Sequence, residues 1–190
     1  LESLRKENYE DWVQSVGEAC FIYPEVSANV QGFVRSRVSS PGIYLFSDTG
    51  ASTVDQGIFI FFRRDGGEYL TYLHGSVLPL GSSQIEHKAA MNSAKMDWQS
   101  LEKWREIKEQ GGPAPELRKA REWISERLIR GTEATLAFAK NKLFVKDQLN
   151  DTRVIFGGGG HCEYPYKTAV MNPFSGQLFR QSITPDVIGL

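Results

Sequence analysis

Cysteine is scarce in this chain of 190 residues, which contains only Cys20 and Cys162. Two cysteines cannot build a disulfide framework, so we expect both thiols to be free in a reducing compartment, with the cytoplasm as the default location. Long apolar runs are also missing. The longest, such as residues 57–62, match one strand and fall far short of the about 20 residues that a membrane helix needs. The sequence therefore predicts no membrane partner.

An excess of charge of one sign is absent too, since 22 Lys and Arg residues stand against 23 Asp and Glu residues for a formal net charge of -1. Without a broad basic surface to neutralise phosphates, a nucleic-acid partner is not expected. The N-terminal residues show neither an apolar signal core nor a basic targeting pattern. Because the chain begins at Leu1 rather than Met, we interpret this start as a cut in a longer protein.

What is present is the composition of a globular domain, with 41% hydrophobic and 24% charged residues, which sets global disorder aside. The spacing of apolar residues and the turn signals predict an order of elements. Helices are expected over 9–20 and 24–37, strands over 43–47, 56–64 and 68–75, helices after Leu80, over 96–110 and over 116–141, a buried strand over 152–156, and a weaker helix over 167–174. The long helix is predicted to bury a stripe of residues at three-or-four spacing, consisting of Leu117, Ala120, Ile124, Leu128, Gly131, Thr135 and Phe138.

Two strands end in turns of small residues, where backbone N–H groups can approach phosphate oxygens without a Cβ in the way. The first turn, DTGASTVD, also carries the carboxylates of Asp48 and Asp55 and the hydroxyls of Ser52 and Thr53. Hard oxygen ligands beside a phosphate cradle suit a magnesium–nucleotide site. A plain hairpin entry, in which the two carboxylates are solvated or cap backbone groups, explains the same pattern.

The second turn consists of the four glycines at 157–160, which follow a buried strand directly. A mere connector does not need four residues of such high conformational entropy, so we favour close approach of a ligand over a flexible loop. His161 and Cys162 follow these glycines but lack the spacing of a metal or thiol site, and His161 is interpreted as a loop residue or one that contacts a nucleoside.

Five segments resemble, in order, the motifs of the superfamily of actin, heat-shock chaperones and sugar kinases. The segment SDTGASTVD is similar to the second phosphate motif, Asp-x-Gly-x-x-Thr-x-Asp, and PEVSA at 24–28 resembles the helix start that precedes it. LGSSQIE at 80–86 resembles the loop that closes over the phosphates. TRVIFGGGG at 152–160 is similar to the adenosine motif, and SITPD at 182–186 to a chaperone segment whose aspartate lies near the adenine.

The resemblance implies an α/β lobe of the ribonuclease-H-like type, with residues 1–90 and 150–190 forming a sheet subdomain and residues 91–149 a helical subdomain. It also implies ATP or ADP with magnesium as ligands, and since one nucleotide would have to be held by both glycine turns, we expect these turns to lie side by side at the strand ends. Asp48 would hold the metal through water, and Glu25 and Asp55 would orient the attacking water. The phosphate contacts would come from Thr49, Gly50, Ala51, Ser52 and Thr53, with Gly81 and Ser82 closing over them, and the nucleoside would be flanked by Gly157, Gly158, Gly159, Gly160, His161 and Asp186.

Two departures from the family pattern bear on specificity. Ser82 replaces the second glycine of the closing loop, and HCEYPYK lacks the arginine that the chaperones carry after the adenosine glycines. The first phosphate motif is also missing from the chain. The resemblance therefore implies an ATP-binding lobe that is incomplete and inactive without the first lobe of the same protein.

Several alternatives stay open at this stage. A sugar-kinase-type phosphotransferase lobe would transfer phosphate to a substrate hydroxyl, and a degenerate lobe would bind partners without hydrolysis. A further protein partner is also compatible with the sequence. For the helical residues that contact the nucleoside, Lys119, Arg127 and Arg130 are equal candidates.

Overall fold

The computed structural model describes residues 25–37, 39–94, 96–179 and 182–189. The helix expected over 9–20, Cys20 and Pro24 lie outside the described residues. Among the described helices, none is both long and apolar enough to cross a membrane.

A mixed sheet of five strands forms the centre of the molecule, in the order β3-β2-β1-β4-β5. The strands are β1 (Gly42–Thr49), β2 (Val54–Arg64), β3 (Gly67–Leu78), β4 (Arg153–Gly157) and β5 (Val187–Gly189). The first three form an antiparallel meander, and β4 pairs in parallel with both β1 and β5. The meander and the buried strand β4 confirm the sequence prediction. The short strand β5 was not predicted, because three residues carry no periodicity.

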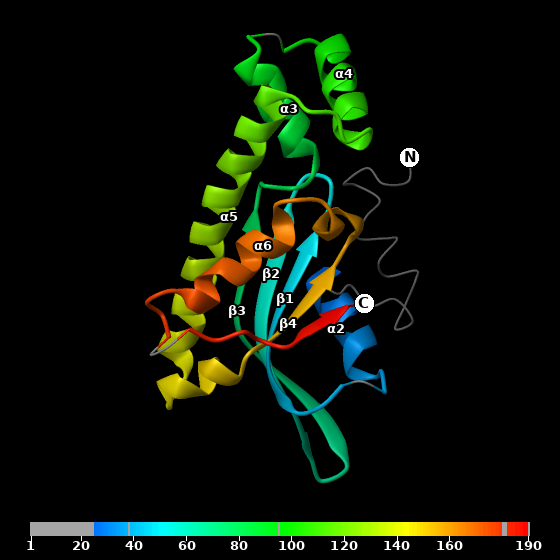
Figure 1. Cartoon of the computed structure of the whole chain (residues 1–190). Coiled ribbons are helices and arrows are strands. Elements are labelled where there is room, and N and C mark those ends of the chain that lie inside the picture. The colour runs from blue at the N-terminus through cyan, green and yellow to red at the C-terminus, as the bar shows by residue number, and fades with distance from the viewer. Residues whose placement is uncertain (1–24, 38, 95, 180–181, 190) are drawn as a thin grey trace, which may run out of the picture.

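A tight turn joins β2 to β3 where the sequence places Asp65 and Gly66. Both residues have positive φ angles, 51° and 76°, as a type I′ hairpin turn requires. The same hairpin contains one irregularity in its pairing between Ile58 and Phe59. In Figure 1 the hairpin extends well below the rest of the sheet.

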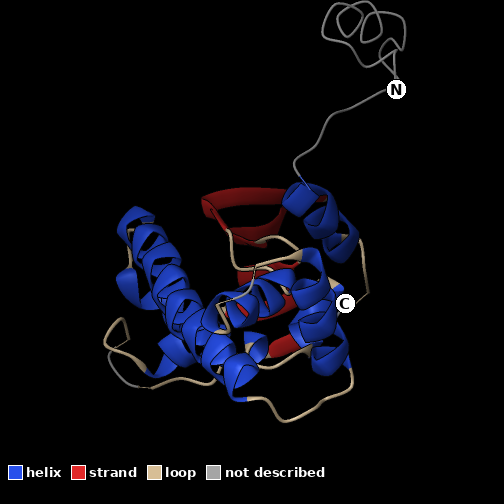
Figure 2. Cartoon of the chain, turned by 90° about the horizontal axis from the view of Figure 1, so that it is seen from above, coloured by secondary structure: helices blue, strands red, loops and turns tan. Residues whose placement is uncertain are grey.

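Helices cover both faces of the sheet. They are α2 (Glu25–Val34), α3 (Ser83–Asn92), α4 (Trp98–Glu109), α5 (Pro115–Lys142) and α6 (Tyr166–Met171), with 3-10 turns at Lys146–Asp151, Gly159–Cys162 and Asn172–Ser175. Seen from above, α2 lies on one face of the sheet, and α5 and α6 lie on the opposite face (Figure 2).

Alternation along β1 divides its side chains between two cores. Tyr44 and Phe46 pack with α2, whereas Ile43 and Leu45 pack with the core that contains α3, α5 and α6. Since successive residues of a strand point to opposite faces, Asp48 continues the α2 side. A hydrogen bond from Asn29 of α2 to Asp48 agrees with this placement.

The segment 96–149 contains only helices within the described residues, as the sequence predicted. In Figure 1, α3 and α4 lie beyond the strand ends at the top of the view, and α5 runs from there along the sheet. The core residues of α5 belong to the same cluster as those of the sheet. The assignment of residues 91–149 to a separate helical subdomain stays a prediction.

The predicted buried stripe of α5 is correct at Leu117, Ala120, Ile124, Leu128 and Thr135, half-buried at Gly131, and wrong at Phe138. Phe138 is 57% exposed and stacks on His74 of β3. Leu136 and Ala139 are buried in its place. Along the 28 residues of α5, the buried face drifts relative to a fixed pattern of three- and four-residue steps, because the helix has 3.6 residues per turn. Continuing that pattern to the end of the helix therefore selected Phe138 in place of its buried neighbour Ala139.

Candidate functional site at the carboxyl ends of β1 and β4

The turn between β1 and β2, residues 49–53, is called here the phosphate turn. The Gly50 amide donates to the Thr53 carbonyl at 3.0 Å and closes the turn. Within the described residues, the amides of Ala51 and Ser52 donate no backbone hydrogen bond, and both residues are exposed. Free N–H groups at an exposed turn are available to an anion.

A second loop, residues 81–83 at the start of α3, binds along the phosphate turn. The amides of Gly81, Ser82 and Ser83 donate to the carbonyls of Ser52, Gly50 and Ala51 at 3.1, 2.9 and 2.8 Å. Gly81 is required here because a Cβ would lie 2.4 Å from the Ala51 carbonyl oxygen. The φ of Ser82 is −61°, a value open to any residue, which explains why serine can replace the family's second glycine.

The glycine loop, residues 157–160, lies against the other two loops. Gly157 pairs with Asp48 across the parallel strands. A Cβ on Gly160 would lie 2.7 Å from Thr49 Cγ2 and 3.3 Å from Ser82 Cβ. The prediction that the two glycine turns open at the same edge of the sheet is therefore confirmed.

These loops line a pocket of about 420 Å³, whose walls are formed by Thr49, Gly50, Ala51, Ser82, Lys108, Glu109, Gly159, Gly160 and Glu163. The hydroxyl of Thr49 is buried and has no hydrogen-bond partner among the described residues. A buried hydroxyl without a partner is costly. It would gain one from a ligand in this pocket, so the residues present fit an anionic ligand with acceptor oxygens.

Two carboxylates lie beside the phosphate turn, opposite each other in the β1–β2 pairing. Asn29 Nδ2 donates to Asp48 Oδ2 at 2.8 Å, and Thr53 Oγ1 donates to Asp55 Oδ2 at 3.0 Å. Burial raises the pKa of Asp48 above its usual value, and the nearby Asp55 raises it further, whereas Asn29 and His161 lower it. One carboxylate at the edge of an anion site fits Mg²⁺, which keeps several of its waters.

Comparisons with solved structures agree on the architecture. The chain superposes on an archaeal actin homolog with a TM-score of 0.54 at 13% identity, over 87% of this chain and 49% of that one. It superposes on the PilM–PilN complex of type IV pilus biogenesis with a TM-score of 0.52 at 16% identity, over 78% of this chain and 36% of that one. The chain has an actin-like fold. It spans less than half the length of either neighbour. No protein-family model and no curated protein sequence matches it.

Two further predicted residues, His161 and Glu25, can be placed within this actin-like fold. His161 stacks on Phe156, with ring centroids 5.9 Å apart, and its Nδ1 contacts the carbonyl oxygen of Gly158. Glu25 is the first residue of α2, one helical turn before Asn29. The structure describes its backbone but not its side chain.

A cluster of charged residues behind the glycine loop was not predicted. Lys108 of α4 lines the pocket and bonds to Glu86 of α3, and Arg121 of α5 lies 3.6 Å from Glu163. None of the three helical candidates lines this pocket: Lys119 is exposed, Arg127 stacks over Trp123, and Arg130 lines a different pocket. The only sequence signal for Glu163 was its position three residues after the glycine tract.

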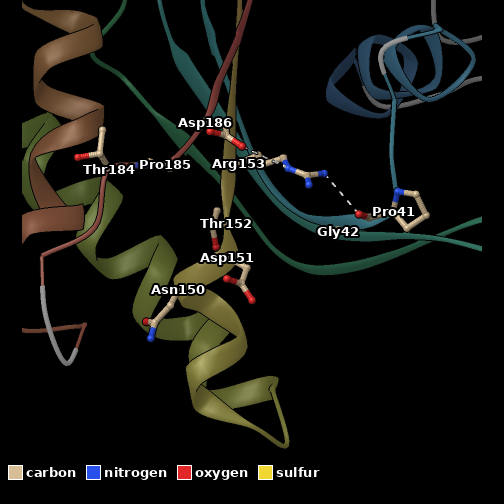
Figure 3. A pocket seen from close by; sticks show the side chains of 9 residues that line it. All are labelled: Pro41, Gly42, Asn150, Asp151, Thr152, Arg153, Thr184, Pro185 and Asp186. Atoms are coloured by element: carbon tan, nitrogen blue, oxygen red, sulfur yellow. Dashed lines mark hydrogen bonds and ion pairs between the residues drawn. The ribbon is translucent and has the colours of Figure 1, made fainter.

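The structure does not bring Asp186 to the glycine loop of this actin-like fold. The Asp186 carbonyl accepts a hydrogen bond from the Val154 amide, so Asp186 lies beside the start of β4. The glycine loop follows the other end of that strand, about 13 Å away at 3.3 Å per residue. Figure 3 shows Asp186 in a separate pocket with Arg153. The expected position of Asp186 near the nucleoside was wrong. Asp186 directly precedes β5, which runs parallel to β4, so it lies at the amino ends of these strands and the glycine loop lies at their carboxyl ends.

Proposed function

We propose that this chain is the second nucleotide-binding lobe of an actin-like ATPase, whose first lobe belongs to the same, longer protein. The observation that carries the proposal is the contact of three loops from distant parts of the sequence, residues 49–53, 81–83 and 157–160. All three lie where the strands β1 and β4 end, and ligands of open α/β sheets bind outside the carboxyl ends of strands.

The phosphate side of the proposed site is formed by the phosphate turn. The free amides of Ala51 and Ser52 would donate to phosphate oxygens, and so would the buried hydroxyl of Thr49. Since these donors are held by the hydrogen bonds to residues 81–83, they do not have to reorganise when the ligand binds.

The metal side of the proposed site is Asp48. Magnesium bound there through water would neutralise charge on the phosphates. Asn29 holds one carboxylate oxygen of Asp48, which fixes its orientation. Asp55, held by Thr53, and Glu25 would orient a water for hydrolysis in the complete protein.

The nucleoside side lies between the glycine loop and α4. Gly159, Gly160, Lys108 and Glu109 all line the pocket. ATP is the nucleotide that the family resemblance implies. A peptide backbone without side chains can lie flat against a nucleoside, which is what the glycines provide.

Calorimetry of this chain with Mg-ATP, together with hydrolysis assays of the full-length protein, tests the proposal. We expect weak binding and no turnover by this chain, because half a cleft leaves the phosphates in water. At about 1.4 kcal/mol per tenfold, the loss of several kcal/mol moves a micromolar site toward millimolar. The full-length protein should bind tightly and hydrolyse ATP.

The same assays separate the rival functions. ATP consumption that requires an added sugar would indicate a sugar-kinase-type phosphotransferase. Failure of the full-length protein to bind any nucleotide would indicate a degenerate interaction lobe and would contradict the proposal. Tight binding with turnover by this chain alone would contradict the claim that it is half of a cleft.

A further inference from the structure

Glu163 is a pocket residue whose carboxylate makes two long ion pairs but no hydrogen bond of 3.5 Å or less with the described residues. Its amide donates to the Gly160 carbonyl at 3.1 Å, which ties it to the glycine loop. The nearest cations are Arg121 Nη2 at 3.6 Å from Oε1 and Lys108 Nζ at 3.7 Å from Oε2. Both distances exceed those of a hydrogen bond, and Oε1 is buried without a hydrogen-bond partner. The carboxylate therefore keeps unused capacity to accept hydrogen bonds.

The neighbouring carboxylate, Glu86, is in the opposite situation. Lys108 donates to Glu86 Oε2 at 2.6 Å and to the Ser82 carbonyl at 3.1 Å, and Arg105 lies 3.7 Å from Glu86 Oε1. Lys108 is thus committed to Glu86 and to the closing loop. Of the two acids, Glu163 is the one left for a ligand.

We propose that Glu163 determines which purine the pocket accepts, by taking hydrogen bonds from the adjacent N1–H and N2–H donors of guanine. This inference rests on the proposed nucleotide-binding function and names the specificity of that same site. The side chain follows the glycine loop, which is proposed to flank the nucleoside, and it lines the pocket.

The chemistry of the two purines decides the direction of the preference. An ionised carboxylate can only accept hydrogen bonds. Guanine presents two neighbouring donors, whereas adenine presents one amino donor beside the acceptor N1, whose lone pair repels a carboxylate. A binding site discriminates strongly against a ligand that leaves one of the site's buried polar groups without a hydrogen-bond partner.

Protonation of Glu163 changes the match. Burial raises the pKa of Glu163 above its usual value; Lys108 and Arg121 lower it, and Glu86 raises it. The buried phenol of Tyr166 on α6 also lies near Glu163, and the charge of Glu163 contributes to the raised pKa of that phenol. A neutral carboxyl group donates one hydrogen bond and accepts another, which matches N1 and the amino group of adenine. Lowering the pH toward the Glu163 pKa should therefore shift the preference toward ATP.

Affinities of this chain for Mg-GTP and Mg-ATP, measured for the wild type, Glu163→Gln and the control Glu109→Gln, test the assignment. Glu109 lines the same pocket, so its substitution removes the same charge. We expect the wild type to prefer GTP by about tenfold, as one good bidentate contact provides. Glu163→Gln should lose most of that preference, because a carboxamide pairs with either purine. Glu109→Gln should change both affinities by the same factor.

The outcomes separate this assignment from the proposed function. Binding of both nucleotides with a ratio that Glu163→Gln leaves unchanged would overturn the assignment alone. If Glu163→Gln weakened the binding of ribonucleotides but not of 2′-deoxynucleotides, Glu163 would contact the sugar, and the purine assignment would also be overturned. No binding of either nucleotide at millimolar concentration would overturn both. The pH dependence of the wild-type ratio needs no variant, and it decides the question even if Glu163→Gln does not fold.

Discussion

The two ends of the central sheet each carry a pocket, and only one of them suits the proposed nucleotide. The pocket at the carboxyl ends of β1 and β4 measures about 420 Å³, and the one at the opposite end about 490 Å³. The first is built from glycine-containing turns with free amides. The second is lined by the side chains of Asn150, Asp151, Thr152, Arg153, Thr184 and Asp186 and by Pro41, Gly42 and Pro185 (Figure 3).

The cation of the second pocket is already engaged. Arg153 Nη1 donates to Ser40 Oγ and Tyr44 Oη at 2.5 and 2.9 Å, and the guanidinium also faces Asp186 at 3.8 Å. The nearby carboxylates of Asp151 and Asp186 repel phosphates. Pocket size therefore does not distinguish the two ends of the sheet, whereas the uncommitted backbone donors of residues 51 and 52 do.

The largest effect is expected for Gly158→Ala. Gly158 has a φ of 73° and a ψ of 155°, a region that is essentially restricted to glycine. A Cβ there would lie 2.3 Å from Asp48 Oδ1 and 2.5 Å from the Thr49 carbonyl oxygen. We expect a loss of about 3 kcal/mol in the free energy of unfolding, measured with urea, and loss of Mg-nucleotide binding.

Gly159→Ala is the matched control, since a Cβ at Gly159 would meet no atom within 4 Å. This variant should keep its stability. Equal effects of the two substitutions would show that the packing of the glycine loop on Asp48 and Thr49 is not what shapes the site.

A smaller effect, confined to binding, is expected for Asp48→Asn. The change removes the proposed metal-side charge, so the gain in nucleotide affinity on adding magnesium should fall about tenfold. Stability should not decrease, because burial raises the pKa of Asp48 and so disfavours its charged form. Nucleotide titrations with magnesium and with a chelator measure the gain in affinity, and thermal unfolding measures the stability.

Asp186→Asn makes the same change at the opposite end of the sheet. Its side chain is 83% exposed, and we expect no change in magnesium dependence. If both variants behaved alike, the metal role proposed for Asp48 would be wrong.

The smallest effect is expected for Arg153→Met. The substitution keeps the apolar stem but removes the hydrogen bonds to Ser40 and Tyr44, at a cost of about 1 kcal/mol in urea unfolding. Nucleotide affinity should stay unchanged. A measurable change in affinity would mean that the two ends of the sheet are coupled.

Much of the site could be predicted from local sequence. The strand and turn at 42–53 follow from apolar residues that run directly into small ones, and the glycines after β4 carry the same signal. These features are local, because the backbone of a glycine turn depends on a few consecutive residues. The order of the motifs then predicted that the two turns meet, which the structure confirms.

Other residues of the site carried no such signal. Asn29 lies on a helix that only tertiary packing brings onto Asp48. Lys108 lies at the end of a polar helix whose charges all look alike in sequence, and its role emerges from its bond to Glu86, 22 positions away. Ion pairs between separate helices have no periodicity that a single sequence can reveal.

The sequence by itself determined which backbone segments can approach a phosphate, because alternation, helical spacing and glycine content act over a few neighbouring residues. Only the tertiary structure decided which side chains surround those segments. It placed Glu163 and Lys108 behind the glycine loop and Asp186 at the far end of β4. The physical reason is that strand pairing and helix packing join residues far apart in the chain, and the direction in which a strand crosses the sheet determines the end at which its flanking residues lie.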